Sequence, residues 1–129
     1  MAKTNQIEEV MEAARKDSQV LAVMLFGSRA RGTGSRVSDI DLCLVLSPKS
    51  YSPLQMSRKK LEYTSRFSAD IQVFQQLPLY IRQRVLRDGK VLYCRDEDAL
   101  YDIAFSVIRE YVHFEYAYRD YLKEVARAR

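Results

Sequence analysis

Two short apolar segments constrain most strongly what this chain can fold into. Residues 20–26 are apolar without interruption, and residues 40–46 carry one acid in an otherwise apolar run. Runs of this length, the first ending at Gly27 and the second at Ser47-Pro48, are typical of strands buried inside a sheet. We therefore expect both segments to be buried β-strands.

Helical patterns alternate with strand patterns along the rest of the chain. We expect helices over residues 5–16, 53–66 and 78–87, a third strand over 69–75 and a short one over 91–93. From residue 96 almost to the end, apolar residues recur at steps of three and four, which predicts one long helix. The chain has 129 residues, so we expect a single domain. The predicted fold is α/β (α+β), with a mixed sheet of about four strands flanked by helices, a core at about residues 5–95 and a C-terminal helix at about 96–127.

Composition excludes several kinds of chemistry. One histidine and two distant cysteines argue against a zinc site or a thiol redox pair, so carboxylates would have to hold any metal. The net charge of +4 is too small to indicate nucleic-acid binding. No apolar run approaches the roughly 20 residues of a membrane span, and the N-terminus does not resemble a secretory signal. We therefore expect a cytoplasmic protein.

Three aspartates follow the pattern of a carboxylate metal site. Asp39 and Asp41 are two residues apart at the mouth of a strand, so their side chains point to the same face. Their mutual repulsion would cost stability unless a cation were bound there. Asp70 begins the next strand pattern and would share that face. If the two strands are neighbours, three carboxylates converge, which is enough to hold two Mg²⁺ ions.

The loop upstream of these acids suits a phosphate group. Gly27 ends the first strand, and Ser28 begins what we expect to be a short helix. Backbone N–H groups at such a turn bind phosphate oxygens, and the Ser28 hydroxyl adds a donor. Arg29 and Arg31 are candidates for contact with a phosphate, and Arg36 is a weaker one, although all three could instead be solvated surface charges.

These motifs together resemble the minimal nucleotidyltransferases of the DNA polymerase beta superfamily. That family's pattern is Gly-Ser, ten residues and Asp-x-Asp, and here Gly27-Ser28 is followed by residues 29–38 and Asp39-Ile40-Asp41. The family's third acid matches Asp70, and residues 88–93 resemble its segment after the third helix. The resemblance covers about residues 5–95, and its combination of motifs is far more specific than a lone glycine-rich loop.

The resemblance implies an Mg²⁺-dependent transfer of AMP from ATP to a hydroxyl group, with release of pyrophosphate. Asp39 and Asp41 would bind both metal ions, and Asp70 would bind the catalytic one and help to deprotonate the acceptor. Gly27 and Ser28 would hold the triphosphate. Members of this subfamily often pair with a HEPN-domain toxin and act as antitoxins that adenylylate one of its tyrosines. Because the chain is small, we expect such a partner protein to be the acceptor.

Two other functions are consistent with the same sequence. The chain could be an antitoxin that acts by complex formation alone, or a small-molecule nucleotidyltransferase of the aminoglycoside type. A helix as long as the last one cannot bury its whole length on a small domain, so residues 116–125 are a candidate partner surface. The toxin could bind through this helix or through the face that carries the site, and a homo- or hetero-oligomer is possible. We interpret His113 as a surface residue and Cys43 as a packed small residue.

Overall fold

The computed structural model describes residues 2–27 and 40–128, and its elements follow the predicted order. The helices and strands are α1 (Ala2–Arg15), β1 (Val20–Phe26), β2 (Asp41–Leu46), α2 (Pro53–Arg66), β3 (Asp70–Val73), α3 (Leu79–Asp88), β4 (Lys90–Cys94) and α4 (Glu97–Arg127), with a short 3₁₀ turn, η1 (Phe74–Gln76), after β3. The predicted fold class, a small mixed sheet with flanking helices and a long C-terminal helix, is confirmed.

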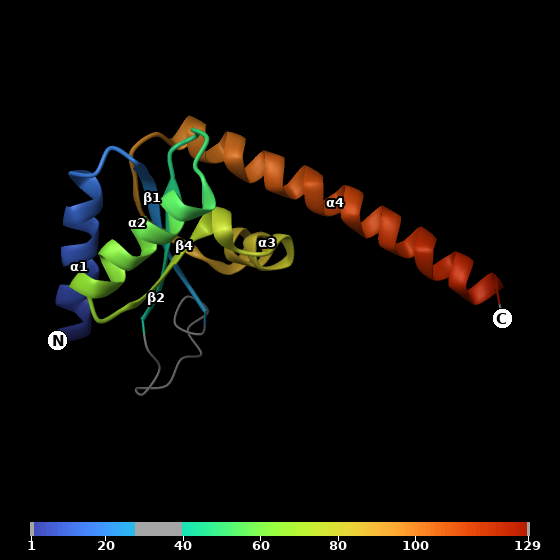
Figure 1. The fold of residues 1–129 in the computed structure, drawn as a ribbon, viewed down its shortest axis with the longest axis horizontal. Helices are drawn as coiled ribbons and strands as arrows, with labels where there is room; N and C mark the ends of the chain where they lie inside the picture. The colour runs from blue at the N-terminus through green and yellow to red at the C-terminus, as the bar shows by residue number, and fades with distance from the viewer. Residues whose placement is uncertain (1, 28–39, 129) are drawn as a thin grey trace.

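The four strands form one mixed sheet in the order β3-β2-β1-β4. β1 is antiparallel to both of its neighbours, whereas β2 and β3 are parallel and joined through α2. Helices α1 and α2 lie on one face of the sheet, and α3 and α4 lie on the other (Figure 1). Each face therefore has its own apolar core, and this explains why β1 and β2 are apolar on both sides.

The first core contains Val23, Leu44 and Tyr63 among others, and the second contains Met24, Cys43 and Val107. Cys43 is fully buried in the second core, and burial raises the pKa of its thiol. It is therefore a packed residue rather than a nucleophile, as expected. Asp41 lies two residues before Cys43 in β2, and side chains two residues apart in a strand point to the same face. The Asp41 side chain therefore also lies on the α3–α4 face of the sheet.

The third strand is shorter than predicted. The sequence pattern suggested a strand over residues 69–75, but β3 ends at Val73, and residues 74–76 form η1. The side-chain amide of Gln75 explains the difference. Its Oε1 accepts from the Leu46 N–H at 3.1 Å, and its Nε2 donates to the Leu46 carbonyl at 2.9 Å. A side chain thus takes the place of the strand backbone at the end of β2.

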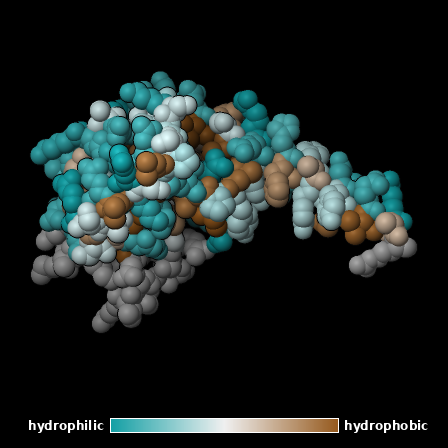
Figure 2. Space-filling view, in the orientation of Figure 1, coloured by the Kyte–Doolittle hydropathy of each residue, from teal (hydrophilic) through white to brown (hydrophobic). Residues whose placement is uncertain are grey.

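Helix α4 leaves the body of the molecule about halfway along its length. Val107, in its first half, is only 4% exposed and packs against β1 and α3. Beyond this point Phe114, Tyr118 and Tyr121 are each more than half exposed. Figure 2 shows apolar side chains along the projecting part of the helix. The expectation that the far end of this helix is not buried is confirmed.

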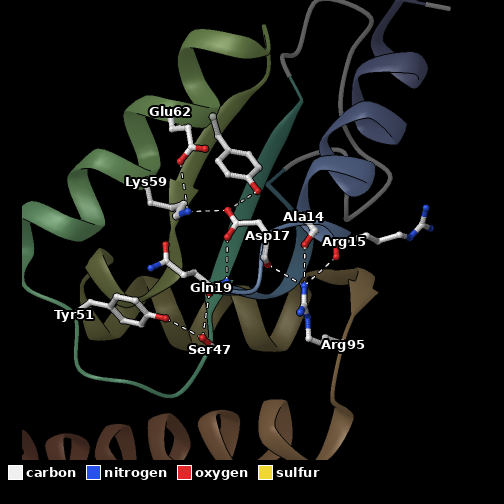
Figure 3. Close-up of polar contacts among 10 residues, drawn as sticks. Ala14, Arg15, Asp17, Gln19, Ser47, Tyr51, Lys59, Glu62 and Arg95 are labelled. Carbon is white, nitrogen blue, oxygen red and sulfur yellow. Dashed lines mark hydrogen bonds and ion pairs between the residues drawn. The ribbon is translucent and has the colours of Figure 1, made fainter.

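A polar cluster joins α2 to the turn between α1 and β1 (Figure 3). One carboxylate oxygen of Asp17 accepts from the Lys59 ammonium at 2.7 Å and from the Tyr63 hydroxyl at 3.1 Å. The Asp17 carbonyl, together with the last carbonyls of α1, accepts from the Arg95 guanidinium. Burial alone would raise the pKa of the Asp17 carboxyl, but the hydrogen bonds from Lys59 and the Gln19 N–H outweigh burial and lower it.

We expect Asp17→Ala to reduce the free energy of unfolding at pH 7 by about 2 kcal/mol, because it removes the nearer of the two carboxylates that pair with the partly buried Lys59 ammonium and also removes the acceptor of the Tyr63 hydroxyl. The Lys59 side chain is only 11% exposed. Urea denaturation measures the change, with Glu12→Ala as the control. Glu12 pairs with Arg15 on the surface, so its removal should cost less than about 1 kcal/mol. Equal losses in both variants would contradict the prediction.

The same cluster predicts how stability depends on pH. Because folding lowers the pKa of Asp17 below its ordinary value of 3.8, this residue stabilises the folded chain above that pH. Its contribution is lost as the pH falls through the folded pKa. The difference in unfolding free energy between wild type and Asp17→Ala should therefore shrink in acid.

Candidate functional site

Two of the predicted carboxylates lie side by side at one end of the sheet. Strands β2 and β3 pair in parallel with Asp41 opposite Asp70, and the Asp70 N–H donates to the Ile40 carbonyl at 2.9 Å. Residues opposite one another in parallel strands project to the same face, so both carboxylates lie on the α3–α4 face. Asp41 is half-buried and Asp70 is exposed. The carboxylates were expected to converge only if their two strands were neighbours, and β2 and β3 are neighbours.

The Asp70 carboxylate is oriented by a chain of hydrogen bonds. Gln72, two residues further along β3, donates from Nε2 to Asp70 Oδ1 at 3.2 Å. The Lys60 ammonium, on α2, donates to Gln72 Oε1 at 3.0 Å. The Gln72 amide is thereby held with its NH₂ group towards Asp70. The other carboxylate oxygen of Asp70, Oδ2, takes no part in these hydrogen bonds.

Gly27 brings the end of β1 against the Asp41 carboxylate. Its φ of 85° lies in the left-handed region that side-chain-bearing residues rarely adopt. A Cβ atom at this position would lie 2.5 Å from Asp41 Oδ2. The backbone can therefore approach this carboxylate only because residue 27 is glycine. The structure therefore places Gly27, the first residue of the predicted phosphate-binding turn, against one predicted metal ligand.

A cavity of about 210 Å³ opens beside Gly27 on the same face of the sheet. Its walls are apolar at Phe26, Ile81 and Val85, and charged at Arg84 and Asp88. Ligand pockets for whole small molecules usually measure about 300 Å³ or more, so this one suits a single ring or group of a larger ligand. It lies next to the carboxylates and has the size for one part of a substrate.

The α3 side of this cavity was not predicted from the sequence. Arg84 and Asp88 are four residues apart, which brings them to one face of a helix, but many solvated charge pairs share that spacing. Asp88 also accepts two hydrogen bonds from Arg87, both at 3.0 Å. Only the packing of α3 against β1 brings these residues to Gly27. No local sequence signal would have identified them.

The other predicted site residues, Ser28, Arg29, Arg31, Arg36 and Asp39, lie outside the residues that the structure describes. Within residues 2–27 and 40–128, no group of three histidine, cysteine or acidic side chains is arranged to hold a metal ion. Asp41 and Asp70 nevertheless supply the hard oxygen ligands that Mg²⁺ prefers, at adjacent positions. His113 is exposed on α4, far along the chain from these residues, as expected.

Within the same described ranges, no helix combines the length and the apolar character that crossing a bilayer requires.

Comparison with known proteins agrees with this geometry. Residues 8–98 match the family model described as polymerase beta, nucleotidyltransferase. The curated protein named "Putative protein adenylyltransferase MJ1547", from Methanocaldococcus jannaschii, is 32% identical over 76 residues. That alignment covers 59% of this chain and 57% of the other protein, so the chain spans less than two thirds of this relative.

Two solved structures have a similar fold over nearly the whole chain. A chain in a crystal structure of a toxin–antitoxin with AMP-PNP has a TM-score of 0.65 at 22% identity, covering 94% of this chain and 96% of its own length. A chain in a structure of the tri-AMPylated Shewanella oneidensis HEPN toxin in complex with MNT antitoxin has a TM-score of 0.65 at 16% identity, covering 97% and 98%. The shared fold therefore extends into α4.

Proposed function

Starting from the polymerase beta nucleotidyltransferase family, to which this chain belongs, we propose that it transfers AMP from ATP to a hydroxyl group of a partner protein. The observation that carries the proposal is the in-register pair Asp41 and Asp70 beside the left-handed Gly27. Two carboxylates and a left-handed glycine at one point suit a reaction on a nucleoside triphosphate.

The proposed step is an in-line substitution at the α-phosphorus of ATP. The acceptor oxygen forms the new bond to phosphorus, the bond to the bridging oxygen breaks, and pyrophosphate leaves. Asp70 accepts the proton of the acceptor hydroxyl, and the Gln72 amide holds its carboxylate in position. The backbone at Gly27, continued by Ser28, donates to phosphate oxygens, and Arg29 and Arg31 add positive charge.

Asp41 and Asp70, together with Asp39, are the residues that we propose to hold Mg²⁺. When bound there, the ions would offset the charge of the triphosphate and make the acceptor hydroxyl a better nucleophile. Asp41 suits this role because it is half-buried and fixed against Gly27, so its carboxylate is already in place before substrate arrives.

We propose that the acceptor is a tyrosine hydroxyl of a HEPN-type toxin encoded next to this chain, which would make the protein an antitoxin. Two observations support this choice. A chain of the same fold occurs in a complex whose HEPN toxin carries AMP groups. The curated relative is itself named for adenylyl transfer to proteins.

The test is to incubate the purified chain with ATP, Mg²⁺ and the HEPN-type protein of the adjacent gene. Mass spectrometry should find AMP on a tyrosine of that protein. Two outcomes contradict the proposal. Protection from the toxin without any AMP on it would favour an antitoxin that acts by binding alone. Pyrophosphate release with an aminoglycoside, and no need for the partner, would favour the small-molecule enzyme.

Removal of divalent metal should abolish the transfer. We expect excess EDTA to lower the rate at least about 100-fold, and added Mg²⁺ to restore it, because only carboxylates are proposed to hold the ions. Circular dichroism and the melting temperature should stay unchanged in EDTA, since both cores are apolar and independent of this site. Undiminished transfer in EDTA would contradict the metal assignment.

A further inference from the structure

Helix α4 carries an apolar row whose heptad spacing continues past the end of the domain. The row steps by four and three through Leu100, Ala104, Val107, Tyr111, Phe114, Tyr118, Tyr121 and Val125. Such spacing keeps all members of the row on one face of a helix, as in a coiled-coil seam. The first half of the row packs on the domain, where Val107 is 4% exposed and Leu100 adjoins the second core. In the second half the row stays on the same face of the helix, and its side chains are exposed in the part of the chain that the structure describes.

We call the second half the distal row: Phe114, Tyr118, Tyr121 and Val125. These side chains are 54%, 53%, 62% and 38% exposed. The rings of Phe114 and Tyr118 already stack, with centroids 6.0 Å apart and an interplanar angle of 11°. Tyrosine and phenylalanine are enriched where protein surfaces meet. An exposed row that contains a stacked aromatic pair is therefore well suited to bind another protein.

The charges beside the distal row indicate what kind of surface it fits. At 100° per residue, the nearest charged side chain on one edge is Glu115 and on the other edge Glu124. Glu115 forms an ion pair with Arg119 at 3.9 Å, and Glu124 forms one with Arg127 at 3.4 Å. Both arginines lie further from the row than the glutamates. On both edges the carboxylate thus lies closer to the row than the guanidinium that pairs with it. A helix with an apolar row and basic edges would be complementary, whereas a second copy would bring the same carboxylates.

The position of α4 links this surface to the carboxylates. Helices α3 and α4 cover the same face of the sheet, which is also the face of Asp41 and Asp70. In Figure 1, α4 diverges from α3 towards the C-terminus, and an open angle lies between its distal half and the body. The distal row continues the face that packs on the body, so it faces this angle. A protein bound there would lie beside α3 and the cavity at Gly27.

We propose that the distal row docks an amphipathic, basic-edged helix of the acceptor protein and so holds that protein beside the end of the sheet that carries Asp41 and Asp70. The inference rests on the proposed function for the identity of the acceptor. Two copies joined through this row alone would bury roughly half of the ~800 Å² per partner that stable interfaces need. An acceptor that also fills the angle beside α3 can bury more.

The test compares two double variants of the full chain, Phe114→Glu with Tyr118→Glu in the distal row, and Val112→Glu with Tyr116→Glu on the opposite face. All four side chains are exposed, so both variants should keep the wild-type melting temperature. Binding to the HEPN-type protein is measured by calorimetry without ATP. The distal-row variant should bind at least about 100-fold more weakly, because two aromatic contact residues are lost. The control should bind like wild type.

Transfer kinetics provide a second readout. The distal-row variant should have a raised KM for the acceptor protein and an unchanged kcat, because the reacting groups are intact. Three results would overturn the proposal: wild-type binding by the distal-row variant, equal loss in the control variant, or a wild-type homodimer in light scattering that the distal-row variant turns into a monomer.

The two proposals fail separately. Binding through the distal row without any AMP transfer would contradict the proposed function and leave the docking surface standing. AMP transfer by the distal-row variant with an unchanged KM would contradict the docking surface and leave the proposed function standing. The variant Asp70→Asn should bind the acceptor protein as tightly as wild type, which keeps binding and catalysis distinct.

Discussion

Asp41→Asn or Asp70→Asn will each lower the rate of AMP transfer by about 1,000-fold or more, because several kilocalories per mole of metal-assisted charge stabilisation depend on these carboxylates. Asparagine keeps the shape of the side chain and removes its negative charge. The two residues are direct register partners on one face of the sheet, so loss of either one leaves a single described carboxylate at this point. Initial rates with radiolabelled ATP and saturating acceptor measure the effect.

The fold should survive both substitutions. Two carboxylates at adjacent positions repel each other, so removal of one charge should leave the melting temperature unchanged or slightly raised. The matched control is Asp102→Asn, which removes one exposed carboxylate from α4, outside the proposed site, and should transfer AMP at the wild-type rate. A tenfold loss of rate corresponds to only about 1.4 kcal/mol of activation free energy. A loss of that size or smaller in Asp41→Asn would show that Asp41 is not part of the reaction centre.

Gly27→Ala should lower both stability and transfer. An alanine at a φ of 85° is strained by about 1–2 kcal/mol. Its Cβ would also lie 2.5 Å from Asp41 Oδ2, so the carboxylate must move. A displacement of about 1 Å at a reacting group can cost about 100-fold in rate, and we expect a loss of that size per folded molecule. Chemical denaturation and initial rates, measured well below the melting temperature, separate the two effects.

Gly89→Ala is the informative comparison for Gly27→Ala. A Cβ at residue 89 would meet the Val85 carbonyl at 2.5 Å and the Leu25 carbonyl at 3.1 Å, which are backbone atoms rather than part of Asp41 or Asp70. Because Val85 lines the cavity but the Asp41 carboxylate is left in place, this variant should lose stability and lose less of its transfer rate per folded molecule than Gly27→Ala. If both glycine variants lost activity only in proportion to their unfolded fraction, the proposed role of Gly27 in placing Asp41 would be wrong.

Local patterns predicted the elements well where local forces decide them. The strand over residues 20–26 is confirmed with its limits, because an apolar run bounded by a glycine has few alternatives. Helix α2 begins at Pro53, as predicted, and the Ser52–Gln55 capping box fixes that start. The alternation of Asp41 with Leu42 placed the carboxylate on the correct face, because strand side chains alternate strictly.

Contacts between residues distant in sequence were not predictable in this way. The Gln75 amide replaces a strand at the end of β2 through hydrogen bonds to a residue 29 positions away. The Tyr63 hydroxyl reaches Asp17 across 46 positions, and no motif joins them. The cavity at Gly27 depends on where α3 packs. Each of these features is set by the packing of helices on the sheet rather than by residue type or spacing.

The projecting half of α4 also bears on the lifetime of the protein. Its turns beyond the domain are held by their own backbone hydrogen bonds and weak surface ion pairs, so they should fray readily in the single chain. Fraying exposes peptide bonds to proteases and an aromatic row to aggregation. Among the described helices and strands, limited proteolysis should therefore cut α4 first, and a docked partner should protect it. The amount of intact protein in a cell would then follow the amount of its partner.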